Sequence, residues 1–462
     1  MSASESETPW VAQSLMHGLA RRGYRRAVPR ATPPLRRGGV PFSTPSAPDW
    51  PEHLLSAAPR QGGGAATLAW CFDTSRIDAL PIASPPSAQR VVGAVHTEGR
   101  SRAWRLDEVL GALEECGVDR GSLAAGILPG PPDEGGAEPL PGALSEVGIR
   151  ERAVVDRLPP GTPRRLSARS GPCFTLESPV GPGCSAHCRP GCSCGRYVLL
   201  GYGRFGAGRS GAGRSGDGRS GDGESGPGRS AARPGREVFE AVLLEHAVGC
   251  VLAGVRSSLE LPALRPLVDG IDGAFPELSA GPRGRAAVEV VADHLCTVAL
   301  LLGGGIAPGP RGASHVVRRL VRRAATEVLL AGGRPEGLVA AAALADAAVR
   351  APLGLAPLPA DALALVHREV VALRAGLATG RRWFLRRASD TRPDDLPQLV
   401  WRARRERGVP IAILLAWCEE RSLPVPLSRL AALDPPHPPH PPASSRGVRL
   451  SLATGTNGMS SG

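Results

Sequence analysis

The chain contains no lysine. All 55 of its basic residues are arginines, and Asn457 is its only asparagine, a bias that we attribute to a GC-rich genome. Without a lysine amine, P-loop nucleotide sites, Schiff-base enzymes and Ser–Lys dyads are excluded. Any cationic site must use guanidinium groups, whose two parallel donors suit phosphate and carboxylate oxygens.

Aromatic residues are also scarce, at 4% of the chain, so a core must consist mainly of Leu, Val and Ala. No run approaches about 20 apolar residues, which argues against a membrane span. The first ten residues, MSASESETPW, lack the apolar segment of a secretory signal. We therefore expect a cytoplasmic protein without a membrane partner. The ten cysteines are then expected to be free thiols or metal ligands rather than disulfides.

Length and charge set the remaining bounds. The 462 residues have room for roughly two or three domains. A formal net charge of +12 and a pI of about 10.0 favour a polyanionic partner. Glycine and proline together, at 59 and 47 residues, indicate that part of the chain lacks regular structure.

The organisation along the chain follows from its patterns. Residues 90–95 read as a strand and 106–116 as a helix. R-S-G-x-G units recur in residues 201–236, and such a segment cannot bury apolar surface, so we expect a disordered linker there. Helical periodicity then dominates from residue 237 to residue 430. The tail 433–462 is rich in Pro and His and is also expected to be disordered.

One helix, expected between Ser314 as its N-cap and Gly332-Gly333 as its end, separates apolar from basic residues. At 100° per residue, one side carries Val316, Val317, Leu320, Val321, Ala324 and Val328. The other side carries Arg318, Arg319, Arg322 and Arg323. No acid occurs between His294 and Thr326, so the neighbouring sequence offers no counter-charge. Spacing alone is compatible with a solvated face and with an RNA-binding face.

The segment from Val288 to Ala324 as a whole resembles the tRNA-recognition helices of alanyl-tRNA synthetases, which carry VVADH and GIAPxxxGxxxVxRRxxRRA with this spacing. The resemblance implies that these helices bind a tRNA acceptor stem. The family reads a G·U pair through an Asn and an Asp, and Pro310 and Arg405 stand at those two positions. We therefore expect retained affinity for the RNA backbone with relaxed selectivity. The implied RNA-binding residues are Arg311, Arg318, Arg319, Arg322, Arg323 and Arg405.

Shorter matches extend the resemblance over most of residues 12–430. They are strong in 254–258, 264–267 and 401–425, and weaker in 21–24, 171–173 and 192–197; no segment resembles the family's editing or C-terminal domains. The implied fold is α+β, with a class II synthetase-like antiparallel sheet and flanking helices followed by an all-α tRNA-recognition domain. The catalytic region would comprise 1–200 and 237–275 on either side of the linker, and the tRNA-recognition domain 276–432.

Enzymes of this family use ATP and Mg²⁺ to activate an amino acid, alanine, before transferring it to tRNA. Their second motif, RHHTFFEMLG, matches here at Arg102 and Glu108, which implies catalytic roles for both. Their third motif, DTGMGLER, maps onto 239–246, where bulky residues replace the glycines and His246 replaces the arginine that holds a phosphate. A neutral imidazole cannot reproduce a bidentate cation. We therefore expect aminoacylation to be weakened or lost.

A cysteine cluster of pattern C-x3-C-x3-C-x-C lies between residues 184 and 194. Zinc favours four thiolate or imidazole ligands at close spacing, so the pattern is compatible with a structural Zn²⁺ site and equally with a loop of reduced thiols. The candidate ligands are Cys184, Cys188, Cys192 and Cys194.

Three functions are compatible with these features. The first is a tRNA-binding relative of alanyl-tRNA synthetases with weakened or absent ligase activity. The second is an active ligase retargeted to another tRNA or amino acid. The third is a non-catalytic regulatory protein whose basic helix binds any acidic surface.

Overall fold

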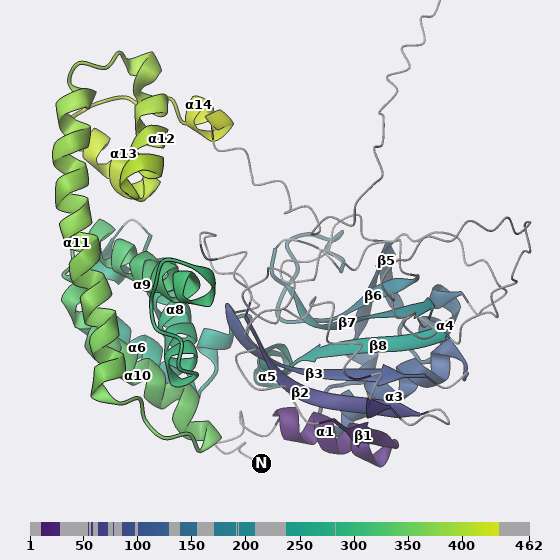
Figure 1. Cartoon of the computed structure of the whole chain (residues 1–462). Coiled ribbons are helices and arrows are strands. Elements are labelled where there is room, and N and C mark those ends of the chain that lie inside the picture. Colours follow the sequence, from purple (N-terminus) through teal and green to yellow (C-terminus); the bar gives the residue numbers. More distant parts are fainter. Residues whose placement is uncertain are drawn as a thin grey trace, which may run out of the picture. The chain divides into compact units, whose positions relative to one another are not determined.

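The computed structural model describes residues 11–27, 54, 57–58, 63–72, 77, 86–97, 100–128, 139–154, 171–190, 192, 194–207, 237–281 and 283–433 (Figure 1). These residues belong to two compact units. The first contains the described residues up to Arg374, and the second those from Ala375 onward. Residues 208–236 and 434–462 lie outside the described residues, so their disorder stays a prediction.

Eight strands form one sheet, in the order β1-β2-β3-β8-β7-β6-β4-β5. In chain order, the strands are β1 (Tyr24–Arg26), β2 (Gly64–Phe72), β3 (Ala88–His96), β4 (Ala124–Leu128), β5 (Glu151–Val154), β6 (Cys173–Pro179), β7 (Tyr197–Ala207) and β8 (Glu237–Leu244). The strand expected over 90–95 is confirmed as β3. Residues 201–207, which we expected in the linker, are instead the second half of β7, paired with β6 and β8.

The sheet is mixed rather than purely antiparallel. Its six inner strands pair antiparallel, as expected, but β1 runs parallel to β2 and β5 runs parallel to β4. Strands β4 and β5 are joined through helix α4 (Leu140–Glu146), and a crossover through a helix returns the chain in the same direction. The parallel edges therefore follow from connections too long for hairpins.

The sheet has one apolar face, which helices cover. Because residues opposite one another in a ladder share a face, the registers place these side chains together: Ala66, Val92, Ala94, Phe174, Leu176, Phe205, Phe239, Ala241 and Leu243. Helices α1 (Val11–Arg21), α3 (Arg102–Glu115) and α5 (Glu245–Ala253) share one buried core with this face. Gly203 lies against the Phe174 ring, where a Cβ would approach Cζ to 2.5 Å, so this position in β7 requires glycine.

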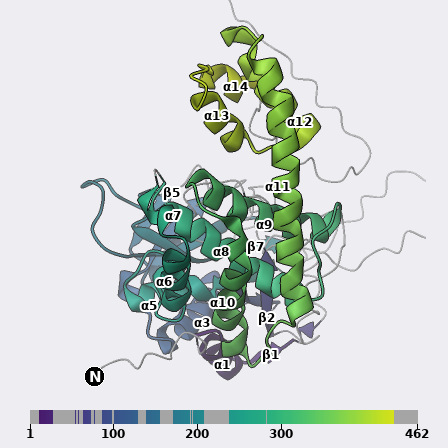
Figure 2. The same ribbon diagram turned by 90° about the vertical axis from the view of Figure 1, so that its left-hand side faces the viewer.

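Helices dominate after β8, as expected. The first unit continues with α6 (Arg265–Ala274), α7 (Pro276–Ala280), α8 (Arg285–Gly303), α9 (Gly312–Leu330) and α10 (Leu338–Arg350). Figure 2 shows α8 among α6, α9 and α10. Within the described residues, α8 alone is long and apolar enough to cross a membrane, yet 72% of that stretch is buried inside the structure. Packing against its neighbours accounts for its apolar composition.

Helix α9 begins at Gly312, two residues before the expected cap, and no side chain caps it. Its end ahead of Gly332 is as predicted. The six apolar residues predicted for one side are all buried, so the apolar stripe is confirmed.

Helix α11 (Ala360–Ala388) continues past residue 375, where the second unit begins. The second unit also contains α12 (Leu396–Arg407), α13 (Ile411–Glu419) and α14 (Leu427–Leu433). Phe384 is fully buried there, and its ring centroid lies 6.2 Å from that of Trp417. The division near residue 375 thus falls inside the range 276–432 that the sequence suggested as one domain.

Candidate functional site

The second face of the sheet carries polar side chains, and we call it the polar face. The registers place these residues on it: Thr67, Cys71, Gln89, Cys173, Thr175, Tyr202, Arg204 and Glu240. Arg204 and Glu240 stand directly opposite one another and form a two-point ion pair, with Nε–Oε2 at 2.6 Å and Nη2–Oε1 at 2.8 Å. Such a pair orients both side chains on a rigid strand scaffold.

Two buried groups on the polar face lack hydrogen-bond partners among the described residues. Tyr202 is 4% exposed and Gln89 is 2% exposed, yet the Tyr202 hydroxyl and both amide atoms of Gln89 are unpartnered. Burial raises the pKa of Tyr202, so the hydroxyl keeps its proton as a donor. Because an unmade buried hydrogen bond costs about 1–3 kcal/mol, these groups are candidates for contacts with a bound molecule.

His246 lies at the far end of β8. The last ladder pair is Val91–Leu244, and the Arg90–Glu245 ion pair, with Nε–Oε2 at 3.1 Å, continues that register by one residue. Both ring nitrogens of His246 are buried and have no partner within the described residues. Burial lowers the pKa of His246 from 6.5 to about 3, against the opposing charge of Asp293. The imidazole is therefore neutral near pH 7.

Arg102, by contrast, lies at the other end of β8. Its guanidinium is 3% exposed and pairs with Glu237, the first residue of β8, with Nη2–Oε1 at 2.6 Å. The guanidinium also lies over the Phe205 ring, with Cζ 5.2 Å from the centroid. Because β8 spans about 25 Å at 3.3 Å per residue, Arg102 and His246 are not brought together. Nor is Arg102 on the polar face, because Phe205 belongs to the apolar face.

Glu108 lies on α3, in the helix layer that covers the apolar face. It is half-buried, and its Oε2 is buried without a partner among the residues described. Burial raises the pKa of Glu108, and the nearby Arg22 opposes this shift. The two predicted catalytic residues therefore share a helix that is on the other side of the sheet from Tyr202 and Gln89.

None of the polar-face residues is among the site residues that we predicted from the sequence. A signal was present, because Tyr202 and Arg204 alternate with glycine and Phe205 in β7, while Glu240 interrupts an apolar run in β8. Period-two alternation of this kind predicts a strand with two different faces. The glycine-rich repeat that follows obscured it.

The arginines of α9 are half-buried, and three of them pair with an acid on another helix or within α9 itself. Arg318 Nε lies 3.2 Å from Glu369 Oε1 on α11, and Arg322 pairs with the same carboxylate. Arg323 Nη1 lies 2.6 Å from Glu327 Oε1 one turn later. The counter-charge is therefore supplied by Glu369, 47 residues beyond Arg322, and by Glu327, which directly follows Thr326.

The pKa of His315 is affected by the arginines of α9. Burial lowers its pKa, and the charges of Arg319, Arg318 and Arg322 lower it further. Arg311 is exposed just before α9, and Arg319 is half-buried. Arg405 is exposed on α12 in the second unit, so it does not belong to the compact unit that contains the other five predicted RNA-binding arginines.

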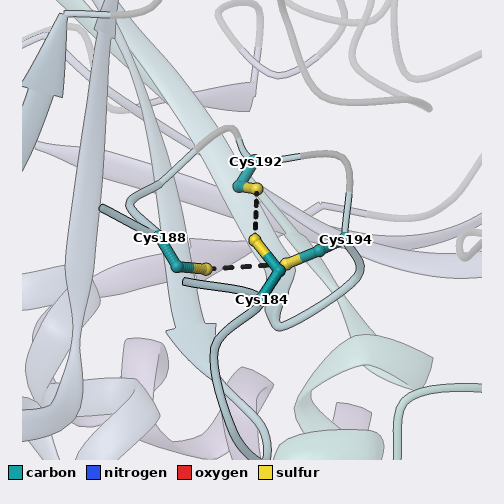
Figure 3. Close-up of side chains that lie close together, drawn as sticks. All are labelled: Cys184, Cys188, Cys192 and Cys194. Carbon is teal, nitrogen blue, oxygen red and sulfur yellow. Dashed lines mark hydrogen bonds between the residues drawn. The ribbon is translucent and has the colours of Figure 1, made fainter. Parts of the chain in front are cut away.

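The four cysteines predicted as metal ligands lie together in the connection between β6 and β7 (Figure 3). Their Sγ atoms all lie within 4.8 Å of one another. Four thiols so placed can hold a Zn²⁺ ion.

Comparison with known proteins finds a family match that covers most of the helical part of the chain. Residues 242–425 match the family described as tRNA synthetases class II (A). The chain is 30% identical over 239 residues, 47% of its length, to the mitochondrial alanine–tRNA ligase of Mus musculus, of which it covers 24%. It is 30% identical over 166 residues, 35% of its length, to the alanine–tRNA ligase of Desulforudis audaxviator, and covers 17% of that enzyme. The chain therefore contains a region of the class II tRNA synthetase (A) family and is distantly homologous to alanine–tRNA ligases over part of its length.

The chain spans about a quarter or less of these alanine–tRNA ligases. Over 89 residues, it is 37% identical to the ligase of Mycobacterium sp. (strain KMS), where the match covers 18% of this chain and 10% of the enzyme. The class II match contains His246, α8, α9 and Arg405, but not Arg102, Glu108 or the four cysteines. The class II match therefore lies mainly in the helical part of the chain.

Proposed function

We propose that the protein binds the acceptor stem of tRNA through the arginine surface of α9 and activates amino acids with ATP weakly or not at all. The observation that carries this proposal is a guanidinium-rich helix face inside the segment that matches class II synthetases. Of its five arginines, Arg318 and Arg322 share the Glu369 carboxylate, and Arg323 pairs with Glu327. The surface keeps an excess of positive charge for phosphates.

Glu369 gives this surface a defined geometry. One carboxylate holds Arg318 and Arg322 on adjacent turns of α9. The ion pairs restrict the rotamers of these two long side chains before RNA binds, so less side-chain entropy is lost on binding. Each guanidinium has five N–H donors, so donors remain for phosphate oxygens. A stem bound this way would be recognised by its shape and backbone rather than by base edges.

Binding of a tRNA transcript, measured over a range of salt concentrations, tests the proposal. We expect Arg318→Ala/Arg322→Ala to weaken binding and to reduce the slope of log K against log salt by up to about 2, since each lost phosphate contact removes about 0.9. Arg25→Ala/Arg26→Ala is the matched control, because it removes the same charge from exposed positions in β1. An equal loss in both variants would favour the regulatory protein that binds any acidic surface. Unchanged binding in the α9 variant would contradict the proposal.

The weak ligase activity follows from the two phosphate-binding positions. Class II synthetases use ATP with Mg²⁺, and Arg102 and His246 are the residues that would have to hold its phosphates here. The Arg102 guanidinium is held by Glu237, a carboxylate that it shares with Arg105, and His246 is uncharged. Losing one such contact costs roughly two to three orders of magnitude in rate. ATP–pyrophosphate exchange with alanine should therefore stay at background.

The polar face favours a second candidate, a ligase retargeted to another amino acid. Tyr202 and Gln89 have hydrogen-bonding capacity to spare, and Arg204 and Glu240 offer both charges that an amino acid needs. Exchange with any member of an amino-acid panel, abolished by Glu240→Ala but not by Arg25→Ala, would establish this candidate. Exchange with none would exclude it.

A further inference from the structure

The connection between β6 and β7 runs from residue 180 to residue 196, although adjacent antiparallel strands need only roughly two to five residues. Val180 is its only described residue in the hydrophobic core. The internal backbone bonds are those of tight turns, such as Cys188 N–H to the Ser185 carbonyl at 3.1 Å and Cys192 N–H to Arg189 at 3.0 Å. A segment with so little apolar burial needs another cross-link to hold one conformation.

The four thiols have the spacing of a tetrahedral metal site. The Sγ atoms of Cys184 and Cys192 lie 3.6 Å apart, and those of Cys188 and Cys194 lie 3.5 Å apart (Figure 3). A zinc–sulfur bond of about 2.3 Å corresponds to a sulfur–sulfur edge of about 3.8 Å in a tetrahedron. A disulfide would require about 2.05 Å, and all four cysteines are free.

Basic groups surround these sulfurs. Four thiolates around a divalent ion carry two net negative charges, and the Arg196 guanidinium donates to the Cys188 sulfur. The backbone N–H of Arg196 donates to Cys194. Such donors to the coordinating atoms orient the ligands and stabilise their charge. Arg256 holds the base of the same connection through the Val180 and Pro182 carbonyls, both at 3.2 Å.

We propose that Cys184, Cys188, Cys192 and Cys194 bind one Zn²⁺ ion that closes this connection and fixes the start of β7. The inference goes beyond the proposed function, because it requires neither tRNA nor ATP. Four protein ligands leave no open position for water or substrate, so the ion is structural. It also braces the sheet edge, because Tyr197 follows the site and its hydroxyl donates to Glu151 of β5.

Metal analysis of the full chain, expressed with zinc and purified under reducing conditions, is the first test. We expect about one zinc per chain, and after exchange into cobalt we expect the thiolate-to-metal charge-transfer and visible bands of a tetrahedral site. Folding is checked by circular dichroism on the same sample. A folded chain that contains no zinc and takes up no cobalt overturns the proposal without recourse to any variant.

Variants locate the ion. Cys184→Ser and Cys192→Ser should each reduce zinc content and weaken the cobalt bands, whereas Cys116→Ser, a half-buried thiol outside the cluster, should retain both. Thiol titration of the native wild type should gain four reactive groups when a chelator is added. Retention of zinc in both cluster variants, or an equal loss in Cys116→Ser, overturns the assignment. So does a mass that shows two disulfides in the reduced preparation.

Discussion

Burial determines the protonation state of His246. A residue that replaces a phosphate-binding arginine was expected to be a weak ligand, and the structure adds that its nitrogens are buried and its pKa is lowered to about 3. Protonation would place an uncompensated charge in an apolar environment. The folded chain therefore resists a proton that the unfolded chain accepts.

This difference predicts a pH dependence of stability. Between pH 6.5 and 3 the unfolded state binds more protons at His246, so the free energy of unfolding should fall as the pH is lowered through this range, by about 1.4 kcal/mol per pH unit. His246→Gln removes the titration. Urea unfolding from pH 4.5 to 7.5 should therefore show a shallower acid loss in the variant, and parallel curves for the two proteins would contradict the buried neutral imidazole.

At the same scale, the sequence located the α9 arginines but not their partners. Helical periodicity identifies a basic face from α9 alone, whereas Glu369 meets Arg318 and Arg322 only after α11 folds back. Similarly, the motif match identified Arg102, but nothing local reveals that Glu237, the first residue of β8, pairs with it. Contacts between distant segments depend on tertiary packing, which a single sequence pattern does not contain.

At the scale of elements, Asp293 on α8 joins the helical region to the sheet. Its Oδ1 accepts the Ser87 N–H just before β3 at 2.8 Å, and its Oδ2 lies 2.9 Å from His294 Nδ1. His294 Nε2 in turn lies 3.2 Å from the Ile77 carbonyl. The VADH segment expected from the family resemblance thus fastens α8 to two points outside the helical region.

Breaking this junction should destabilise the first unit. Asp293→Ala leaves a buried N–H and a buried imidazole without their acceptor, so we expect a loss of about 2–4 kcal/mol in the free energy of unfolding. Asp293→Asn retains an acceptor for Ser87 and should lose less. Arg402→Ala is the control, because its pair with Glu406 is exposed and should contribute under about 1 kcal/mol. Equal effects of Asp293→Ala and Arg402→Ala in denaturant unfolding would refute the junction.

The elements themselves were largely predictable, and the exceptions have physical causes. Periodicity identified β3 and the apolar stripe of α9, and the glycine pair identified the end of α9, because Gly332 adopts a positive φ there. The parallel edges β1 and β5 depend on how the chain crosses the sheet. The second half of β7 was missed because Gly201 and Gly203 resemble the glycine-rich repeat that follows, although Gly203 is needed to admit Phe174 from the neighbouring strand.

At the scale of the whole molecule, the two compact units should respond separately to core damage. Phe384 is fully buried in the second unit against Trp417, and replacing it with Ala should cost about 3–5 kcal/mol. Hydrogen exchange should then accelerate in α12 and α13 and remain unchanged in β3 and β8. Equal acceleration in the sheet would show that the units unfold together.

The unsatisfied polar groups on the polar face lower the stability of the fold. Tyr202→Phe keeps the shape of the ring and removes a buried hydroxyl that no described group satisfies, so the melting temperature should rise. Tyr197→Phe, which removes a hydroxyl bonded to Glu151, should lower it. A fall in Tyr202→Phe would mean that something already satisfies that hydroxyl.

The unpartnered groups of the polar face also indicate where a bound molecule could be sought. Apolar side chains of the same size in place of Gln89 and Tyr202 would remove buried polar groups that have no partner among the described residues. The presence of these polar groups makes the polar face a place to search for a bound molecule by thermal-shift screening with small polar compounds. A rise in melting temperature in the wild type and none in Tyr202→Phe would identify one.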